Sequence, residues 1–359
     1  MRLLFITQKV DLDDDVLGIY HQWIAGVAPA FDQVSVICLY KGKTALPGNV
    51  IIHSLGKERL SAGRHRLLYT IRFLRLAWRL RKEYDVVFVH MNPEYLLLAG
   101  WLWKLLGKRM VFWYAHYLAT VKLRVAAWFA GTILTSTRLA YPLSDRKLVV
   151  LQQGIDTEAF KPSKNLKAKS ENLLRILWVG RMSPVKNVSV LVEAAAILKE
   201  KRTPFSLAII GGPTSGQSLE EQYYVSLQQL VRQRGVGGIV EFLPAIRHRN
   251  LPEVYQNYDV FVNLTDTGSF DKTTLEAMAS GVPVLVSNRA FQDLFEPQLQ
   301  GQLLFKEKDA ADLAEKLIRF NSLSAEARRQ MGELMRRLIV GHHSLPRLVE
   351  RLAEAIKTR

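Results

Sequence analysis

The sequence contains one cysteine and no hydrophobic run long enough to span a membrane. Cys38 lies within the apolar run 34–39, so we expect a buried small hydrophobic residue there. A single cysteine excludes an intramolecular disulfide framework and is typical of a reducing compartment. The longest apolar run, 95–103, falls short of the roughly 18 residues that a spanning helix needs. It therefore predicts a buried core helix.

Acidic residues are scarce as well, with 33 Asp and Glu against 49 Lys and Arg and a net charge of +16. Such a charge suits nucleic acid, anionic lipid or phosphorylated small molecules as partners. We expect no nucleic-acid partner, because the sequence has no zinc-finger spacing, no aromatic ribonucleoprotein motif and no isolated basic tail. The first apolar run, 3–6, is too short for a secretory signal, which favours a cytoplasmic location.

The length of 359 residues and the 48% hydrophobic content are those of a two-domain globular protein. Short apolar runs alternate with amphipathic segments in both halves, which is typical of parallel α/β domains. The polar, lysine-rich stretch 161–172 predicts an interdomain linker. We therefore expect an α/β protein with two Rossmann-like domains at residues 1–160 and 173–340. A C-terminal helix at 341–359 is expected to pack back on the first domain.

The most informative stretch, 267–287, reads as a loop, a helix and a strand that follow the buried strand 258–264. Asp271 occupies a helix-capping position, and Gly281 stops the helix. The helix start would present free backbone N–H groups, which suit an anion and usually a phosphate. Glu276, about one turn into the helix, could accept both hydroxyls of a ribose. An ordinary solvated glutamate is the alternative.

A second candidate phosphate site follows the predicted strand 175–179. Gly180 ends this strand, and Arg181 and Lys186 precede a long amphipathic helix. Two cations beside a strand end and a helix start can neutralise a pyrophosphate without a metal ion. A plain basic loop is the alternative. A dehydrogenase is not expected, since no Gly-x-Gly-x-x-Gly follows the first strand of either domain.

The stretch 268–283 resembles the signature of the family-4-type glycosyltransferases, which are retaining enzymes with the two-domain GT-B fold. In that family two glutamates lie in the motif; the second contacts the donor's ribose and the first contacts its sugar. Glu276 matches the second glutamate, whereas Gly268 stands at the position of the first. The resemblance implies that Glu276 binds ribose and that Asp271 and Lys272 are catalytic residues at the sugar. The donor-sugar loop it implies is Gly268, Ser269, Phe270 and Asp271.

The resemblance covers nearly the whole chain and is strongest over residues 177–288. It assigns donor diphosphate binding to Gly180, Arg181, Lys186 and, by its place after the first strand, Gly18. His116 ends a strand that resembles the family strand beside the donor sugar, so it is expected to bind the sugar or stabilise developing charge. A satisfied core histidine is the alternative there. His21 and His90 are second-rank candidates, and the acidic loop 11–15 either is solvated or orients an acceptor hydroxyl.

The segment 64–82 contains a stripe of cations at helical spacing and no acidic residue. The cations are Arg64, Arg72, Arg75, Arg79 and Lys82. Leu67, Ile71 and Trp78 lie on an adjoining stripe. This pattern predicts either the solvated face of a Rossmann-type helix or a surface that docks on an anionic membrane.

The resemblance implies a hexosyltransferase that moves a sugar from a UDP or GDP sugar to a hydroxyl of a glycan or lipid-linked acceptor. It would work with retention and without metal or cofactor, in cell-envelope glycan biosynthesis at the inner membrane face. The donor would lie on the second domain and the acceptor on the first, across a cleft. Alternatives are a nucleotide-sugar epimerase of similar architecture and an inactive nucleotide-sugar-binding protein, the latter suggested by Gly268.

Overall fold

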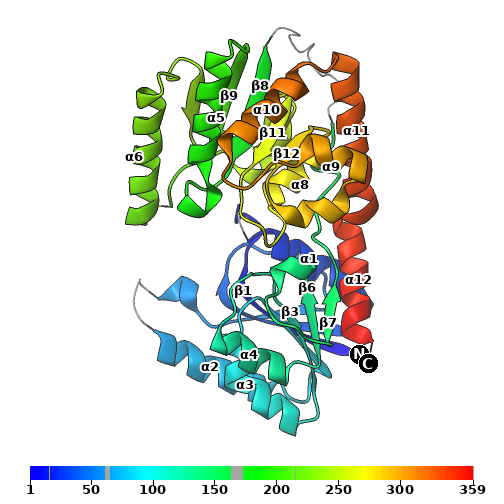
Figure 1. Ribbon diagram of the computed structural model, residues 1–359. Coiled ribbons are helices and arrows are strands. Elements are labelled where there is room, and N and C mark those ends of the chain that lie inside the picture. The colour runs from blue at the N-terminus through cyan, green and yellow to red at the C-terminus, as the bar shows by residue number, and fades with distance from the viewer. Residues whose placement is uncertain (16, 61–64, 163–172, 215, 359) are drawn as a thin grey trace. The chain divides into compact units, whose positions relative to one another are not determined.

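The computed structural model describes residues 1–15, 17–60, 65–162, 173–214 and 216–358. Arg64 and residues 163–172 of the predicted linker lie outside this description. The chain forms two compact units: unit 1 is Met1–Gly154 with Leu345–Arg359, and unit 2 is Ile155–Ser344 (Figure 1). Each unit is an α/β domain around a parallel sheet. The predicted class, α/β with two Rossmann-like domains, is therefore confirmed.

Unit 1 is built on a parallel sheet of seven strands within the described residues, in the order β3-β2-β1-β4-β5-β6-β7. The strands form because short apolar runs recur between helical segments, and the central ones are buried on both faces. The strand bounds are β1 (Arg2–Val10), β2 (Gln33–Lys41), β3 (Val50–Ser54), β4 (Val86–His90), β5 (Arg109–Trp113), β6 (Thr132–Thr135) and β7 (Leu148–Val150).

Helices cover both faces of this sheet. The side chains of α2 (Arg66–Arg79), α3 (Glu94–Leu105) and α4 (Val121–Phe129) share one hydrophobic core with the sheet. The other face is covered by α1 (Ile19–Val27) and α12 (Leu345–Lys357). Cys38 is buried on that second face, as predicted, and burial raises the pKa of its thiol to about 12.

Helix α12 completes unit 1 although more than half of the chain separates it from the first 154 residues. Leu348, Leu352 and Ile356 are buried in the core shared with α1. The guanidinium of Arg109 donates to the carbonyl oxygens of Ala355 and Lys357, at 3.3 and 3.1 Å. The sheet of unit 1 is therefore closed on one face by a segment that follows unit 2 in the sequence.

Unit 2 contains a five-stranded parallel sheet in the order β10-β9-β8-β11-β12, counted over the described residues. Its strands are β8 (Leu174–Val179), β9 (Phe205–Ile210), β10 (Val240–Leu243), β11 (Val260–Asn263) and β12 (Val284–Val286). Its helices are α5 (Val188–Glu200), α6 (Ser218–Gln233), α7 (Leu251–Tyr255), α8 (Lys272–Ala279), α9 (Pro297–Leu303), α10 (Ala310–Asn321) and α11 (Ala325–His342). The short 3-10 helices of unit 2 are η4 (Pro184–Lys186), η5 (His248–Asn250) and η6 (Arg289–Leu294), and those of unit 1 are η1 (Ala28–Ala30), η2 (Lys57–Arg59) and η3 (Arg138–Ala140).

Two glycines allow α11 to approach the end of α8. Gly281 follows α8 with φ of 75°, a left-handed conformation that favours glycine. A Cβ on Gly332 of α11 would lie 2.1 Å from the carbonyl oxygen of Gly281. The backbones therefore touch at this point, which holds the helix carrying Glu276 against α11.

None of the helices among the described residues has both the length and the apolar character of a membrane span.

Candidate functional site

The loops predicted to bind phosphate meet at the centre of the unit 2 sheet. Strands β8 and β11 are neighbours there, and the strand order reverses between them. Open parallel sheets bind ligands outside the carboxyl ends of the strands at this point of reversal. The loop after β8 contains Arg181 and Lys186, and the loop after β11 contains residues 264–271.

Backbone contacts fix the start of the loop after β8. The N–H of Gly180 donates to the carbonyl oxygen of Ile210 at 3.0 Å, and that of Met182 donates to Gly212 at 3.0 Å. Gly211 has φ of 141°, and a Cβ there would lie 1.8 Å from the carbonyl oxygen of Gly180. Only glycine fits such an approach, so Gly211 holds the exit loops of β8 and β9 together.

Lys186 and Asp271 form an ion pair across the two loops. The Lys186 Nζ donates to Asp271 Oδ2 at 2.6 Å, and these side chains are 23% and 12% exposed. Asn263 Nδ2 donates to the same oxygen at 3.2 Å, and Thr273 Oγ1 donates to the other at 3.1 Å. Asp271 makes no side-chain cap to α8, because its carboxylate is turned toward Lys186. The carboxylate thus satisfies the cation that a phosphate would otherwise bind.

Asn187 joins the same two loops in a second way. Its φ is 50°, and its Nδ2 donates to the Leu264 carbonyl oxygen and to Asp266 Oδ1, both at 3.0 Å. Asparagine tolerates the left-handed conformation better than most residues. Asn187 was not predicted from the sequence, although an asparagine directly before a helix was a signal for it.

Arg181 is held by a different carboxylate. Its Nε lies 3.2 Å from Glu220 Oε1, and its side chain is 58% exposed. Glu220 is buried in the first turn of α6, and the N–H of Thr214 donates to it at 2.8 Å. Burial acts to raise the pKa of Glu220, but the hydrogen bonds from Thr214 and the charge of Arg181 lower it overall. Both cations predicted to bind the diphosphate therefore already pair with carboxylates.

Glu276 is buried, with 1% exposure, so it is not the solvated glutamate of the alternative reading. Its Oε1 lies 2.7 Å from His248 Nε2, and the hydroxyl of Tyr255 donates to Oε2 at 3.4 Å. Burial and the Glu276 charge raise the pKa of Tyr255 well above its ordinary value. His248 comes from the loop after β10, so three loops contribute to this edge of the sheet.

The predicted donor-sugar loop is held in place by ring packing and by a hydrogen bond to its backbone. The ring of Phe270 lies 4.9 Å from the rings of both Phe291 and His343, so its side chain packs inward. Asn288 Nδ2 donates to the Ser269 carbonyl oxygen at 2.9 Å. Gly268 is buried and Lys272 is half-buried. Asp271 is the residue of this loop with a side-chain contact to Lys186.

The candidate residues of unit 1 differ in how accessible they are. His90 is buried at the end of β4 against the ring of Tyr20, and burial lowers its pKa to about 3. His21 is also buried, accepts from the N–H of Ala45 at 3.0 Å, and has a lowered pKa because of burial. His116 is partly exposed, stacks on Tyr117, and accepts from the Leu118 N–H at 3.2 Å. Of the three histidines, only His116 is accessible to solvent.

The loop after β1 is held by its own contacts. A Cβ on Gly18 would lie 2.4 Å from the Asp14 carbonyl oxygen, so the loop itself requires this glycine. The Lys9 Nζ lies 3.2 Å from Asp11 Oδ2, and the Lys43 Nζ lies 2.7 Å from Asp13 Oδ2. The acidic loop is therefore neutralised in part by lysines of unit 1.

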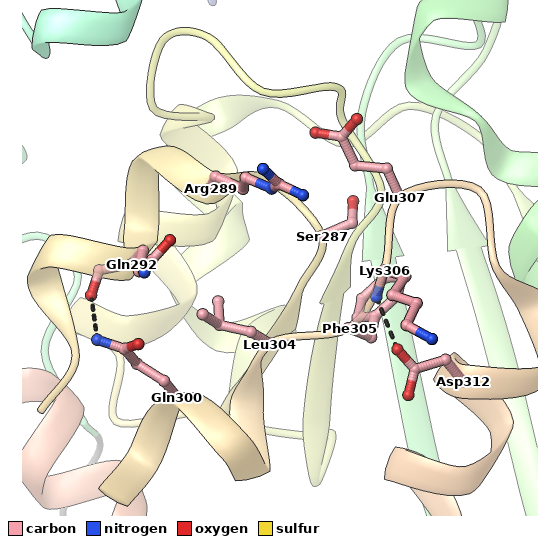
Figure 2. Close-up of a pocket in the computed structure, with 9 residues that line it drawn as sticks. All are labelled: Ser287, Arg289, Gln292, Gln300, Leu304, Phe305, Lys306, Glu307 and Asp312. Carbon is pink, nitrogen blue, oxygen red and sulfur yellow. Dashed lines mark hydrogen bonds between the residues drawn. The ribbon is translucent and has the colours of Figure 1, made fainter. Parts of the chain in front are cut away.

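A cavity of about 590 Å³ opens beside β12 in unit 2 (Figure 2). It is lined by Ser287, Arg289, Gln292, Gln300, Leu304, Phe305, Lys306, Glu307 and Asp312. Glu307 connects it to the loop after β11, since the Thr267 N–H donates to Glu307 at 2.8 Å. None of the site residues predicted from the sequence lines this cavity. In the part of the chain that the structure describes, no cluster of three or more His, Cys, Asp or Glu could hold a metal ion.

Residues 159–337 match the model of the family described as glycosyl transferases group 1. The chain belongs to this family. The resemblance inferred from the motifs of unit 2 is thereby confirmed, and the matched residues include both candidate loops and Glu276.

Curated relatives of this glycosyl transferases group 1 member share part of its length. It is 31% identical over 206 residues to D-inositol 3-phosphate glycosyltransferase of Geodermatophilus obscurus, which covers 54% of this chain and 45% of the relative. It is 32% identical over 146 residues to the enzyme of the same name from Mycobacteroides abscessus, covering 39% and 31%. The chain thus spans less than half of these relatives.

Solved structures show the same fold over the whole chain. HepE of Anabaena, in complex with UDP and glucose, is similar with a TM-score of 0.76 and 16% identity, covering 100% of both chains. Sucrose-phosphate synthase from Thermosynechococcus elongatus is similar with a TM-score of 0.75 and 18% identity, covering 98% of this chain and 97% of the other. At these identities the likeness shows the GT-B fold.

Proposed function

We propose that the protein transfers a sugar, with retention, from a nucleotide-diphosphate sugar to a hydroxyl of a glycan or lipid-linked acceptor. The observation that carries this proposal is the meeting of Lys186, the start of α8 and the loops after β8 and β11 at the reversal of the sheet. Family membership and the UDP complex of the structurally similar HepE support it. The donor we propose is a UDP or GDP sugar.

In this proposal, the donor diphosphate replaces the Asp271 carboxylate on Lys186. Arg181 and the N–H groups at the start of α8 would supply further positive potential. The bond between the sugar's anomeric carbon and the diphosphate oxygen breaks, and a bond to the acceptor oxygen forms. The acceptor proton leaves to the departing diphosphate or to solvent. Negative charge grows on the diphosphate in the transition state, so these groups lower the barrier without a metal ion or cofactor.

The released carboxylate of Asp271 then has a new role. It lies next to the sugar end of the diphosphate, where it can accept hydrogen bonds from sugar hydroxyls, with Lys272 beside it. This would compensate for Gly268 at the position where the family has a glutamate. Glu276 would exchange its contact with His248 for the ribose hydroxyls. We also propose a role at the donor sugar for His116. An epimerase gains no support, because the matched family is one of glycosyl transferases.

The test begins with thermal unfolding in a panel of UDP and GDP sugars, followed by nucleotide release and product analysis with glycan and lipid-linked acceptors. We expect one donor to raise the unfolding temperature and to release its nucleotide faster with an acceptor present. The absence of donor binding across the panel would overturn the proposal. Conversion of the donor without an acceptor would instead identify an epimerase, and donor binding without turnover would identify a binding protein.

Lys186→Ala provides the residue-level check. We expect kcat/KM to fall by about 100-fold, the usual effect of removing one group that stabilises transition-state charge. The matched control is Lys201→Ala, an exposed lysine at the far end of helix α5, which should leave kcat/KM within about twofold. Equal effects of the two substitutions would contradict a phosphate-binding role for Lys186.

A further inference from the structure

Helices α2, α3 and α4 form one layer on one face of the unit 1 sheet. Phe73 of α2, Trp103 of α3 and Leu123 of α4 are buried in the same core with strands of the sheet. Helix α3 contacts both of the others, and the three helices lie together along one side of unit 1 (Figure 1). Their outward side chains therefore form a single surface, which we call the α2–α4 face.

This face is unusually apolar for a surface in water. The described tryptophans that are exposed are Trp78, Trp101 and Trp128, at 52%, 52% and 62%, one on each helix. The exposed aliphatic side chains of the same helices are Leu67, Ile71, Leu105, Val121 and Val125. The sequence predicted that α3 would be a buried core helix, but Trp101 and Leu105 face outward. A large apolar patch on a soluble protein usually marks an interaction surface.

The face is also basic. Helices α2, α3 and α4 contain seven Lys and Arg against one acidic residue, Glu94. The guanidinium of Arg81 lies 4.2 Å from the ring of Trp78, and the Lys104 ammonium lies 3.9 Å from the ring of Trp128. Cations are therefore placed directly beside the exposed tryptophans. Arg72 is an exception in the predicted stripe, because it donates to the Leu55 carbonyl oxygen at 2.7 Å.

The combination of exposed apolar side chains and cations indicates which kind of partner fits the α2–α4 face. The cores of protein interfaces are depleted in lysine and other charged residues, whereas here cations alternate with the apolar side chains. A second copy in a two-fold dimer would place the same cations against one another. An anionic bilayer fits both the apolar side chains and the cations of this face. Tryptophan and leucine enter the boundary between headgroups and acyl chains, and Lys and Arg contact lipid phosphates.

We propose that the α2–α4 face docks on an anionic membrane, with Trp78, Trp101, Trp128 and Leu105 inserted at the headgroup–acyl boundary. This goes beyond the proposed sugar transfer and does not depend on it, because binding would occur without donor or acceptor. It differs from docking by an arginine stripe alone, which would be lost in high salt. Insertion of apolar side chains leaves part of the affinity independent of ionic strength.

Vesicle flotation of the full chain tests the proposal. We expect the protein to float with vesicles of phosphatidylcholine and phosphatidylglycerol in equal parts, and weakly with phosphatidylcholine alone. Replacement of the three tryptophans, Trp78→Ser, Trp101→Ser and Trp128→Ser, should lower partitioning at least tenfold. The matched control replaces three exposed apolar residues of unit 2, Leu219→Ser, Val225→Ser and Val340→Ser, and should float like the unaltered protein.

Two further measurements separate the contribution of the cations to membrane binding from that of the inserted tryptophans. Replacement of three exposed arginines, Arg66→Gln, Arg75→Gln and Arg79→Gln, should lower partitioning by about 100-fold at low salt. Brominated lipids should quench tryptophan fluorescence in the unaltered protein and much less in the tryptophan variant.

Failure to float with anionic vesicles, equal flotation of the tryptophan variant, or dimerisation abolished by the tryptophan substitutions would each overturn the proposal. Near-native circular dichroism of the variants excludes misfolding as the cause.

Discussion

Single residues of the candidate site are paired with one another in the structure described here, and Asp271 is the clearest case. Its carboxylate binds the Lys186 ammonium at 2.6 Å, in a position that suits a phosphate. In the proposed transfer, a donor must displace this carboxylate before it can bind the cation. Asp271 would then compete with the donor in the free protein and become available to the sugar once the donor is bound.

Asp271→Asn should tighten donor binding and slow turnover. The substitution keeps the shape but removes the competing charge, and a hydrogen bond to a charged group is worth enough to change Kd by about tenfold. Turnover should fall because the carboxylate no longer accepts from the sugar. Calorimetric titration with the donor and initial rates would measure the two effects. Asp266→Asn removes a charge from the same loop and should change neither; weaker donor binding by Asp271→Asn would contradict the competition.

His90 should make the protein sensitive to acid. Its pKa is lowered to about 3 by burial, whereas an unfolded chain has a pKa near 6.5. The unfolded state therefore binds a proton first, so stability is full above pH 6.5 and declines as the pH falls toward 3. Between pH 6.5 and 5 this costs about 2 kcal/mol. Urea unfolding of His90→Gln should show a shallower decline than the unaltered protein, while His342→Gln, at an exposed position, should not.

Short-range patterns were sufficient to place Lys186 in a loop after a strand and Glu276 near the start of a helix, because these elements follow one another within a few residues. Their partners were not predictable in the same way. Asp271 and Lys186 are 85 residues apart, and Glu276 and His248 are 28 apart. Such pairs depend on which strands become neighbours, and spacing within one loop contains no information about that.

At the scale of helices and strands, the contact between α8 and α11 depends on a missing side chain. Gly332→Ala would place a Cβ 2.1 Å from the Gly281 carbonyl oxygen, which the two helices can relieve only by separating. We expect the free energy of unfolding of unit 2 to fall by about 1–3 kcal/mol. Gly341→Ala is the matched control in the same helix, with nothing within 4 Å of the added Cβ, and should stabilise by up to about 1 kcal/mol. Chemical denaturation measures both, and equal effects would contradict the close approach.

The elements themselves were well predicted where the apolar pattern was regular. The long amphipathic helix expected directly after Lys186 is α5, Val188–Glu200. Helix α3 differs, because nine consecutive apolar residues contain no periodicity that indicates which side faces water. Its outward side is known only from the packing of its neighbours.

At the scale of the whole molecule, unit 1 depends on α12. Leu352→Ala would remove a side chain with no exposure from the core shared with α1. We expect it to destabilise unit 1 by about 2–5 kcal/mol and to leave unit 2 unchanged. Hydrogen exchange, followed separately in the two sheets, would detect this. Arg347→Ala, at an exposed position of the same helix, is the control, and a uniform loss of protection in both units would contradict the assignment of α12 to unit 1.

The two-domain organisation followed from length, from the linker composition and from the repeated α/β pattern. The return of α12 to unit 1 did not follow from the pattern of the helix itself, since an amphipathic helix alone does not reveal which apolar surface it covers. Its buried residues, Leu348, Leu352 and Ile356, would fit the surface of many helices.

The discontinuity of unit 1 has a consequence for biosynthesis. A ribosome releases residues 1–154 first, yet the helix that covers one face of their sheet emerges only after 190 intervening residues of unit 2. Until then α1 covers part of this face and the apolar surface under α12 stays exposed, while unit 2 can reach its native state earlier. Chaperones that recognise exposed aliphatic segments should accordingly engage the first half of the nascent chain for longer than the second.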